Sequence, residues 1–180
     1  DALSDKDTRV VAQIAPAVRV AVGDHYGLAK GRSVMGKIVN ALHKMGFDEV
    51  YDTTFSADLT IMEETKEFLN RVEKGENLPL LTSCCPAWSV MAKKLFPDHA
   101  NCISMALTPM TLTARLIKKH NPNAKVVFIG PCAAKKLEAM RRSVRSEVDF
   151  VLTFEEMAGI FDAKHVDLSL IHISEPTRLR

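Results

Sequence analysis

The 180-residue chain lacks several features that would assign it quickly to a class of protein. No apolar run approaches the roughly 20 residues that a membrane-spanning helix needs. Acidic and basic side chains nearly balance, with 24 Lys and Arg against 22 Asp and Glu, and no basic run carries interleaved aromatics. These absences argue against a membrane protein and against a nucleic-acid-binding protein.

The N-terminal segment 1–9 also lacks features of a secreted protein. It is polar and charged, without the apolar centre of a secretion signal, so we expect a cytoplasmic location. It has no initiator Met, and we therefore expect that the natural sequence starts upstream.

Cysteine is scarce, with four residues at Cys84, Cys85, Cys102 and Cys132. Without a secretion signal, a disulfide framework is not expected. There is no C-x-x-C pair, which leaves an ordinary zinc site poorly supported. Two of the four cysteines are vicinal, an uncommon arrangement that needs a specific explanation.

The chain does contain a regular alternation of short apolar runs and amphipathic stretches. The apolar runs predict strands, and apolar side chains at helical spacing predict helices. Strands alternating with helices predict an α/β fold, with a mainly parallel sheet flanked by helices. The expected strands are 10–15, 49–53, 78–81, 125–129 and 148–153, and the expected helices are 33–45, 57–74, 86–95, 108–119, 133–142 and 154–161.

The residues from 168 onward break this alternation. Segment 168–178 closely resembles the in-frame translation of a sequencing-library adapter. We therefore expect one partial domain over 1–167, followed by a non-native tail over 168–180 that is left out of any account of the fold. A natural polar tail is the alternative.

Two cysteine motifs stand where an expected strand gives way to an expected helix, at 82–88 and at 130–138. Ligands gather at the carboxyl ends of parallel strands, and helix N-termini favour a thiolate over a thiol. Thiolates from the two motifs could therefore meet at a soft metal centre such as an iron–sulfur cluster, which generally takes four cysteines. Buried packing cysteines and a strained vicinal disulfide are the alternatives.

Together, the two motifs resemble the first and second signatures of the iron-only ([FeFe]) hydrogenase catalytic domain. The family's T-S-C-C-P-G-W is matched by 82–88. Segments 12–19 and 57–64 also resemble family sequence, and the resemblance runs from residue 3 to residue 167. The family's second motif, M-P-C-x-x-K-x-x-E, is matched by Pro131, Cys132, Lys135 and Glu138.

The resemblance implies the family's H-cluster, a [4Fe-4S] cluster joined to a two-iron subsite with CO and cyanide ligands. Cys85 and Cys132 would ligate the [4Fe-4S] part, and Cys84 would face the subsite and hand protons to it. Lys135 would donate a charge-assisted hydrogen bond to a cyanide. The other residues that the resemblance places around the cluster are Ala15, Pro16, Pro131 and Glu138.

A set of charged residues on one expected helix gives a proton route. Glu64, Glu67 and Arg71 lie at i, i+3 and i+7, so they share one helix face. Taken alone, this pattern is typical of a solvated, salt-bridged face. The resemblance makes the two carboxylates a proton relay, with Ser104 between them and Arg71 at the outer end.

The sequence also departs from the family pattern. Ala87 replaces the usual Gly, Gly130 the usual Met, and Ala17 a Ser found in many members. The family's third motif, E-x-M-x-C-x-x-G-C, which supplies the other two cysteines, does not occur. We therefore expect this chain alone to be inactive.

The resemblance implies a fragment of an enzyme that reversibly reduces protons to H2. Its electrons would come from ferredoxin or a nicotinamide-linked electron-transfer subunit, and hydrogenase maturation proteins would be further partners. The alternatives are a hydrogen-sensing relative and a non-catalytic relative used in iron–sulfur protein assembly, which typically has Ala at the position of Cys84. Cys84, with Glu64, Glu67 and Ser104, favours the hydrogenase.

Overall fold

The computed structural model describes residues 2–172 and is built around a four-stranded, all-parallel sheet in the order β2-β1-β3-β4. The two central strands are almost wholly buried, as is usual for parallel strands covered on both faces. This architecture confirms the expected α/β fold. The strands are Val10–Ile14 (β1), Glu49–Asp52 (β2), Lys125–Ile129 (β3) and Phe150–Leu152 (β4).

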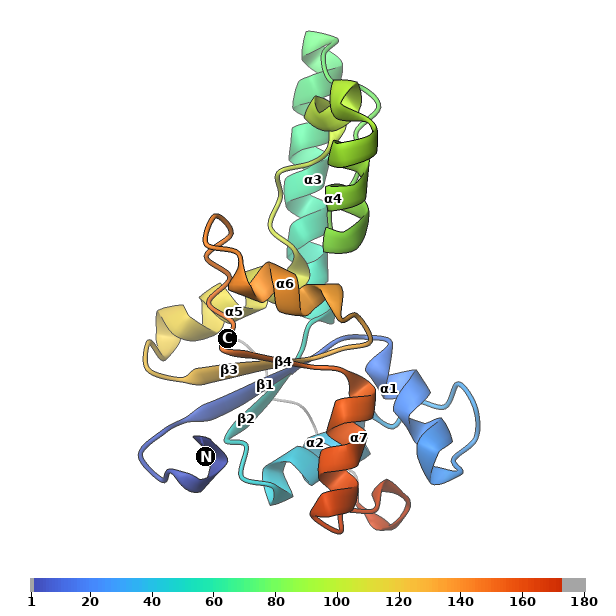
Figure 1. Cartoon of the computed structure of the whole chain (residues 1–180), viewed down its shortest axis with the longest axis vertical. Coiled ribbons are helices and arrows are strands. Elements are labelled where there is room, and N and C mark those ends of the chain that lie inside the picture. The colour runs from blue at the N-terminus through green and yellow to red at the C-terminus, as the bar shows by residue number, and fades with distance from the viewer. Residues whose placement is uncertain (1, 173–180) are drawn as a thin grey trace.

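Helices pack on both faces of the sheet (Figure 1). On one face lie α2 (Met35–Lys44) and α7 (Phe154–Ala163), and on the other α5 (Pro109–His120) and α6 (Ala134–Met140). Alternate residues of β1 point to opposite faces, so one strand contributes to two cores. The larger core includes Val10, Ala12, Ile14, Ile38, Leu42 and Phe161, and the smaller includes Val11, Ala114, Ile117 and Val126.

A pair of helices extends beyond the sheet, and we call it the helical arm: α3 (Thr54–Lys74) and α4 (Pro86–Leu95) (Figure 1). The long helix α3 starts three residues before its expected start, because the side chain of Asp52 accepts hydrogen bonds from the backbone and hydroxyl of Thr54. It ends at Gly75, whose φ of 65° is the left-handed conformation that glycine adopts readily.

The strand expected over 78–81 does not form. Only Leu81 pairs, in an isolated parallel bridge with Ile103. Pro79 has no N–H to donate to a strand ladder, and the bridge lies outside the four-stranded sheet. The first cysteine motif therefore leads into α4 without following a strand of the sheet.

Smaller differences concern short elements. The helix expected over 133–142 and the strand expected over 148–153 are shorter than predicted. Short helical segments that the sequence did not predict are Ala2–Ser4 (η1), Val18–Ala21 (α1), Val22–Tyr26 (η2), Pro97–Cys102 (η3) and Leu168–Leu170 (η4).

Residues 168–172, the described part of the expected tail, pack against the domain. Leu168 is fully buried and Ile171 lies in the larger core. The ammonium of Lys37 donates hydrogen bonds to the carbonyls of Leu168 and Ser169, at 2.9 and 2.8 Å. Residues 168–172 therefore contribute to the packing of the fold, contrary to the expectation that they play no part in it. The domain boundary at 167 and the non-native origin of the tail stay predictions, and 173–180 lie outside the described residues.

None of the helices described within residues 2–172 combines the length and hydrophobicity needed to cross a bilayer.

Candidate functional site

The first cysteine loop, residues 82–85, ends at the N-terminus of α4. Cys84 and Cys85 are both exposed and carry free thiols. Cys85 is the N-cap of the helix, and its sulfur accepts the backbone N–H of Trp88 at 3.5 Å. Pro86 occupies the first turn, as predicted, since its missing N–H costs nothing there. The thiols of this loop are thus accessible, and one is fixed by the helix start.

The second cysteine loop, residues 130–133, follows β3 and precedes α6. Cys132 is half-buried and has a free thiol, and Pro131 is exposed. The neighbouring strand β1 ends at the same edge of the sheet, where the N–H of Ala15 donates to the carbonyl of Ile129 at 2.9 Å. Ala15 is buried and Pro16 is exposed beside it in sequence. The structure therefore places these two residues at the strand ends that carry the second loop.

Lys135 connects the two cysteine loops. Its ammonium donates to the backbone carbonyl of Cys84 at 3.1 Å and to Oε2 of Glu138 at 2.7 Å. Lys135 and Glu138 are both buried, so the carboxylate balances a charge that would be costly alone. The two motifs therefore form one assembly. Its predicted members are Cys84, Cys132, Lys135 and Glu138.

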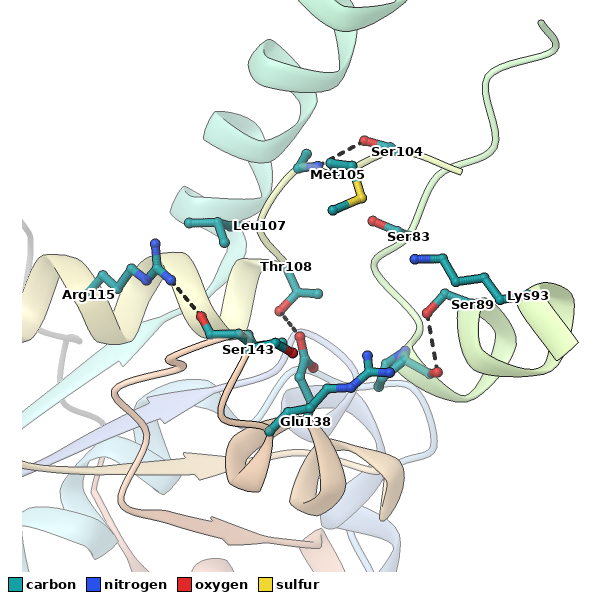
Figure 2. Close-up of a pocket in the computed structure, with 14 residues that line it drawn as sticks. Ser83, Ser89, Lys93, Ser104, Met105, Leu107, Thr108, Arg115, Glu138 and Ser143 are labelled. Carbon is teal, nitrogen blue, oxygen red and sulfur yellow. Dashed lines mark hydrogen bonds between the residues drawn. The ribbon is translucent and has the colours of Figure 1, made fainter. Parts of the chain in front are cut away.

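Thr108 is a member of this assembly that the sequence did not single out. Its hydroxyl donates to Oε1 of Glu138 at 2.8 Å, a contact drawn in Figure 2. Thr108 is also the N-cap of α5. The Thr-Pro pair that opens α5 signals a helix start, but nothing in the sequence relates it to a carboxylate 30 residues away.

Three residues of the predicted proton route form a second group, which we call the relay cluster: Glu67, Ser104 and Arg71. The Ser104 hydroxyl donates to Oε2 of Glu67 at 2.6 Å, and Arg71 forms an ion pair with the other oxygen. Arg71 also donates to the backbone carbonyls of Asn77 and Cys102, at 2.8 and 2.9 Å. The i, i+4 pair on α3 is therefore joined to a segment distant in sequence.

Glu64 does not join the relay cluster through a hydrogen bond that the structure records. Its Oε1 is buried and has no hydrogen-bond partner among residues 2–172. A buried carboxylate oxygen without a partner costs free energy, so such an atom points to a missing donor. No recorded hydrogen bond links Glu64 to Cys84 either.

A cavity of about 410 Å³ lies between the first cysteine loop, the 104–108 segment and the end of α6 (Figure 2). Ser83 lines it from the first loop, and Glu138 from α6. Its lining also carries three cationic side chains, from Lys93, Arg115 and Arg141. The space beside the two motifs is thus hollow and rich in positive charge.

The available cysteines fit part of an iron–sulfur site. Cys85 and Cys132 are accessible free thiols on two loops that Lys135 ties together. Cys102 is buried and its sulfur lies 3.8 Å from the carbonyl of Leu78, so it serves packing. Within residues 2–172, no three or more His, Cys, Asp or Glu side chains group closely enough to hold a metal ion. The described residues therefore offer two accessible thiols to such a site, fewer than the four of a complete cysteine cage.

Known proteins with similar sequences include both enzymes and assembly factors. The chain is 40% identical over 187 aligned residues to "NADP-reducing hydrogenase subunit HndD" of Solidesulfovibrio fructosivorans, which covers 94% of this chain and 32% of that protein. It is 30% identical to "Cytosolic Fe-S cluster assembly factor narfl" of Danio rerio, covering 88% of this chain and 43% of the relative. The chain thus spans less than half the length of these relatives.

A solved structure has the same fold. A variant of [FeFe]-hydrogenase HydA1 from Chlamydomonas reinhardtii superposes with a TM-score of 0.87 at 32% identity, covering 98% of this chain and 50% of the other. The family model "Iron only hydrogenase large subunit, C-terminal domain" matches residues 8–179. The chain therefore belongs to the iron-only hydrogenase large-subunit family.

Proposed function

We propose that this chain supplies the first and second cysteine motifs of an [FeFe]-hydrogenase catalytic domain, which reversibly reduces protons to H2. The observation that carries the proposal is the contact of the Lys135 ammonium with both Cys84 and Glu138, at 3.1 and 2.7 Å. It brings together two motifs that lie about 50 residues apart, as a shared binding site requires. A role in core packing alone would explain neither the exposed Cys84 and Cys85 nor the buried ammonium of Lys135.

Two cysteines would hold the cofactor, with Cys85 and Cys132 as ligands of the [4Fe-4S] part of an H-cluster. When bound, this group would supply electrons and activate hydrogen. The Lys135 ammonium lies beside the first loop and would stabilise negative charge there, such as that of a cyanide ligand. Ala15, Pro16 and Pro131 would line the site from the strand ends.

Protons would pass between the site and the surface along the helical arm. The Cys84 thiol would exchange protons with Glu64, and Ser104 would connect Glu64 to Glu67. The hydrogen bond of 2.6 Å from Ser104 to Glu67 supports the outer half of this route. The unpartnered Oε1 of Glu64 leaves an acceptor free for the inner half. Arg71 would hold Glu67 in place at the outer end.

A second candidate is an iron–sulfur assembly factor, which the similarity to narfl makes a specific alternative. Cys84 and the relay cluster favour the hydrogenase, because assembly of clusters has no need of a proton-delivering thiol. A hydrogen-sensing role is a third candidate, since Gly130 and Ala17 depart from the family's usual residues.

The partners and the location are proposed by analogy. HndD is named as a subunit of an NADP-reducing hydrogenase, so a nicotinamide-linked electron-transfer subunit fits this chain, with ferredoxin as the simpler carrier. Hydrogenase maturation proteins would insert the two-iron subsite. A cytoplasmic location stays a prediction.

Iron binding tests the proposed ligands. The chain is reconstituted without oxygen, using iron, sulfide and a small thiol that replaces the missing ligands. We expect Cys85→Ser and Cys132→Ser each to lower bound iron several-fold, and Cys102→Ser, the matched control, to leave it unchanged. Iron content that is the same in all four proteins would contradict the ligand assignment.

Hydrogen evolution tests the proposed activity. A chimera in which residues 1–167 replace the matching part of the Chlamydomonas enzyme, matured and supplied with reduced methyl viologen, should evolve H2. Cys84→Ala in this chimera should abolish evolution while iron stays bound. A chimera that binds the complete cluster but evolves no H2 would favour an assembly or sensory role.

A further inference from the structure

Thr108 has a hydroxyl with one proton and two neighbours that could accept it. Oε1 of Glu138 lies at 2.8 Å and Oγ1 of Thr111 at 3.3 Å. The carboxylate is nearer and charged, so the proton is directed to Glu138. The oxygen of the same hydroxyl accepts the N–H of Thr111 at 3.4 Å, which caps α5. One side chain therefore joins the start of α5 to a carboxylate on α6.

The Glu138 carboxylate is held from two directions. Thr108 donates to Oε1, and Lys135 donates to Oε2 at 2.7 Å. Glu138 is only 5% exposed, so water reaches its carboxylate only from the cavity that Glu138 and Thr108 both line. If the Thr108 hydroxyl is lost, Oε1 of Glu138 loses the protein donor that fixes it, and the carboxylate gains freedom to turn.

Lys135 depends on this carboxylate for its place. The ammonium sits on a flexible four-carbon stem and carries three N–H donors, two of which go to Glu138 and to the carbonyl of Cys84. The stem alone does not define where the charge lies. The two acceptors of the ammonium do so together, and of these the Glu138 carboxylate is the nearer and the charged one.

We propose that Thr108 is a positioning residue, which acts through Glu138 to fix the Lys135 ammonium against the first cysteine loop. The hydrogen bonds form a continuous chain from Thr108 through Glu138 and Lys135 to Cys84. The proposal deepens the proposed function, since this is the ammonium assigned to the cluster. The positioning itself is a property of the chain without any cofactor, so it can be tested separately.

Lysine acetylation of the folded, iron-free chain measures how firmly this ammonium is held. Brief treatment with an acetylating reagent is followed by mass spectrometry, with Lys74, an exposed lysine on α3, as the internal reference. Thr108→Val keeps the shape and removes the donor. Since one buried hydrogen bond is lost, we expect the Lys135 to Lys74 ratio to rise about fivefold to tenfold. Thr108→Ser, which restores the donor, should stay within about twofold of the original chain.

Thr153→Val is the matched control, because Thr153 is also a threonine N-cap, in the capping box of α7. It should lower stability by a similar amount while leaving the Lys135 ratio unchanged. If Thr108→Val loses helix content by circular dichroism, Thr108→Cys, a weaker donor of similar size, should give a smaller rise.

Two outcomes would overturn the proposal. One is an unchanged ratio in a folded variant of Thr108, and the other is an equal rise in Thr153→Val. Neither depends on iron, so a failure of the proposed function would show in the iron and hydrogen assays alone.

Discussion

The ring of Phe128 occupies the space that a side chain at position 130 would need. A Cβ built on Gly130 would lie 2.5 Å from Cε1 of Phe128 and 3.3 Å from Cβ of Ala15. The two residues are two positions apart at the end of β3, and so they face the same side of the sheet. The family's second motif usually has Met at this position. In this chain, the ring of Phe128 therefore fills the space in which the family's methionine side chain would lie.

Restoring the methionine should destabilise the protein. Gly130→Met would force the buried Phe128 ring from its place, and overpacking of this kind typically costs about 1–3 kcal/mol. Urea unfolding of the variant and the original chain, followed by circular dichroism, measures the difference.

The double variant tests whether the two positions are coupled. Phe128→Ala alone leaves a cavity and should lower the free energy of unfolding by about 3–5 kcal/mol. Combined with Gly130→Met, it should cost clearly less than the sum of the two single changes, because the thioether enters the vacated space. Simple additivity would show that the ring and position 130 do not share this space.

The elements that the sequence predicted best are those with a strong local signal, and the helix expected over 86–95, with Pro86 in its first turn, matches α4. The expected strand over 125–129 matches β3, because a continuous apolar run suits a central parallel strand. The prediction of a strand over 78–81 was wrong because Leu78 and Pro79 are exposed and only Leu81 pairs, with Ile103 outside the sheet. An apolar run alone does not show which surface it packs against.

In the candidate site too, contacts set by local geometry could be predicted and contacts set by packing could not. The i, i+4 spacing of Glu67 and Arg71 predicts their ion pair, since helix geometry alone brings them together. The contact of Thr108 with Glu138 spans 30 residues and depends on how α5 and α6 lie on the sheet. No local pattern in the sequence encodes this contact.

Arg71 should matter for stability as well as for the proton route. Its planar guanidinium spreads its donors over Glu67 and the carbonyls of Asn77 and Cys102, a fork geometry that the compact ammonium of lysine lacks. We expect Arg71→Lys to lower the free energy of unfolding by about 1.5–3 kcal/mol. Hydrogen exchange by mass spectrometry should show faster exchange near residues 77 and 102.

Lys66→Ala provides the control for this prediction. Lys66 pairs with Glu63 on the same helix, but both side chains are more than 60% exposed. Exposed pairs contribute little, so we expect a change within about 0.5 kcal/mol. An equal loss in both variants would mean that the carbonyl contacts of Arg71 add nothing.

Asp149 should make part of the stability depend on pH. Burial alone raises the pKa of its carboxyl, but hydrogen bonds from the Val126 N–H and from Lys118 and Lys125 outweigh it and hold the pKa below its ordinary value. A lowered folded-state pKa gives stability that is present above about pH 4 and is lost as the pH falls through the folded-state pKa. Asp149→Asn should therefore lower Tm at pH 7, and the difference from the original chain should shrink in acid.

Thermal unfolding of both proteins between pH 7 and pH 3 checks this expectation. A difference in Tm that stays constant over this range would mean that the charged form of Asp149 is not what stabilises the start of β3.

The relay cluster gives the sharpest prediction on activity. Glu67 accepts the Ser104 hydroxyl at 2.6 Å and is held by Arg71, so Glu67→Gln keeps the shape and one acceptor but removes a group that can take up and release a proton. In the full catalytic domain, hydrogen evolution should fall by about 100-fold or more, as for other losses of a proton-transfer group. Infrared and electron paramagnetic resonance spectra should show the cluster assembled as before. Glu63→Gln, an exposed carboxylate on the same helix, should leave turnover unchanged. Full turnover in Glu67→Gln would exclude Glu67 from the proton route, whatever the cysteines bind.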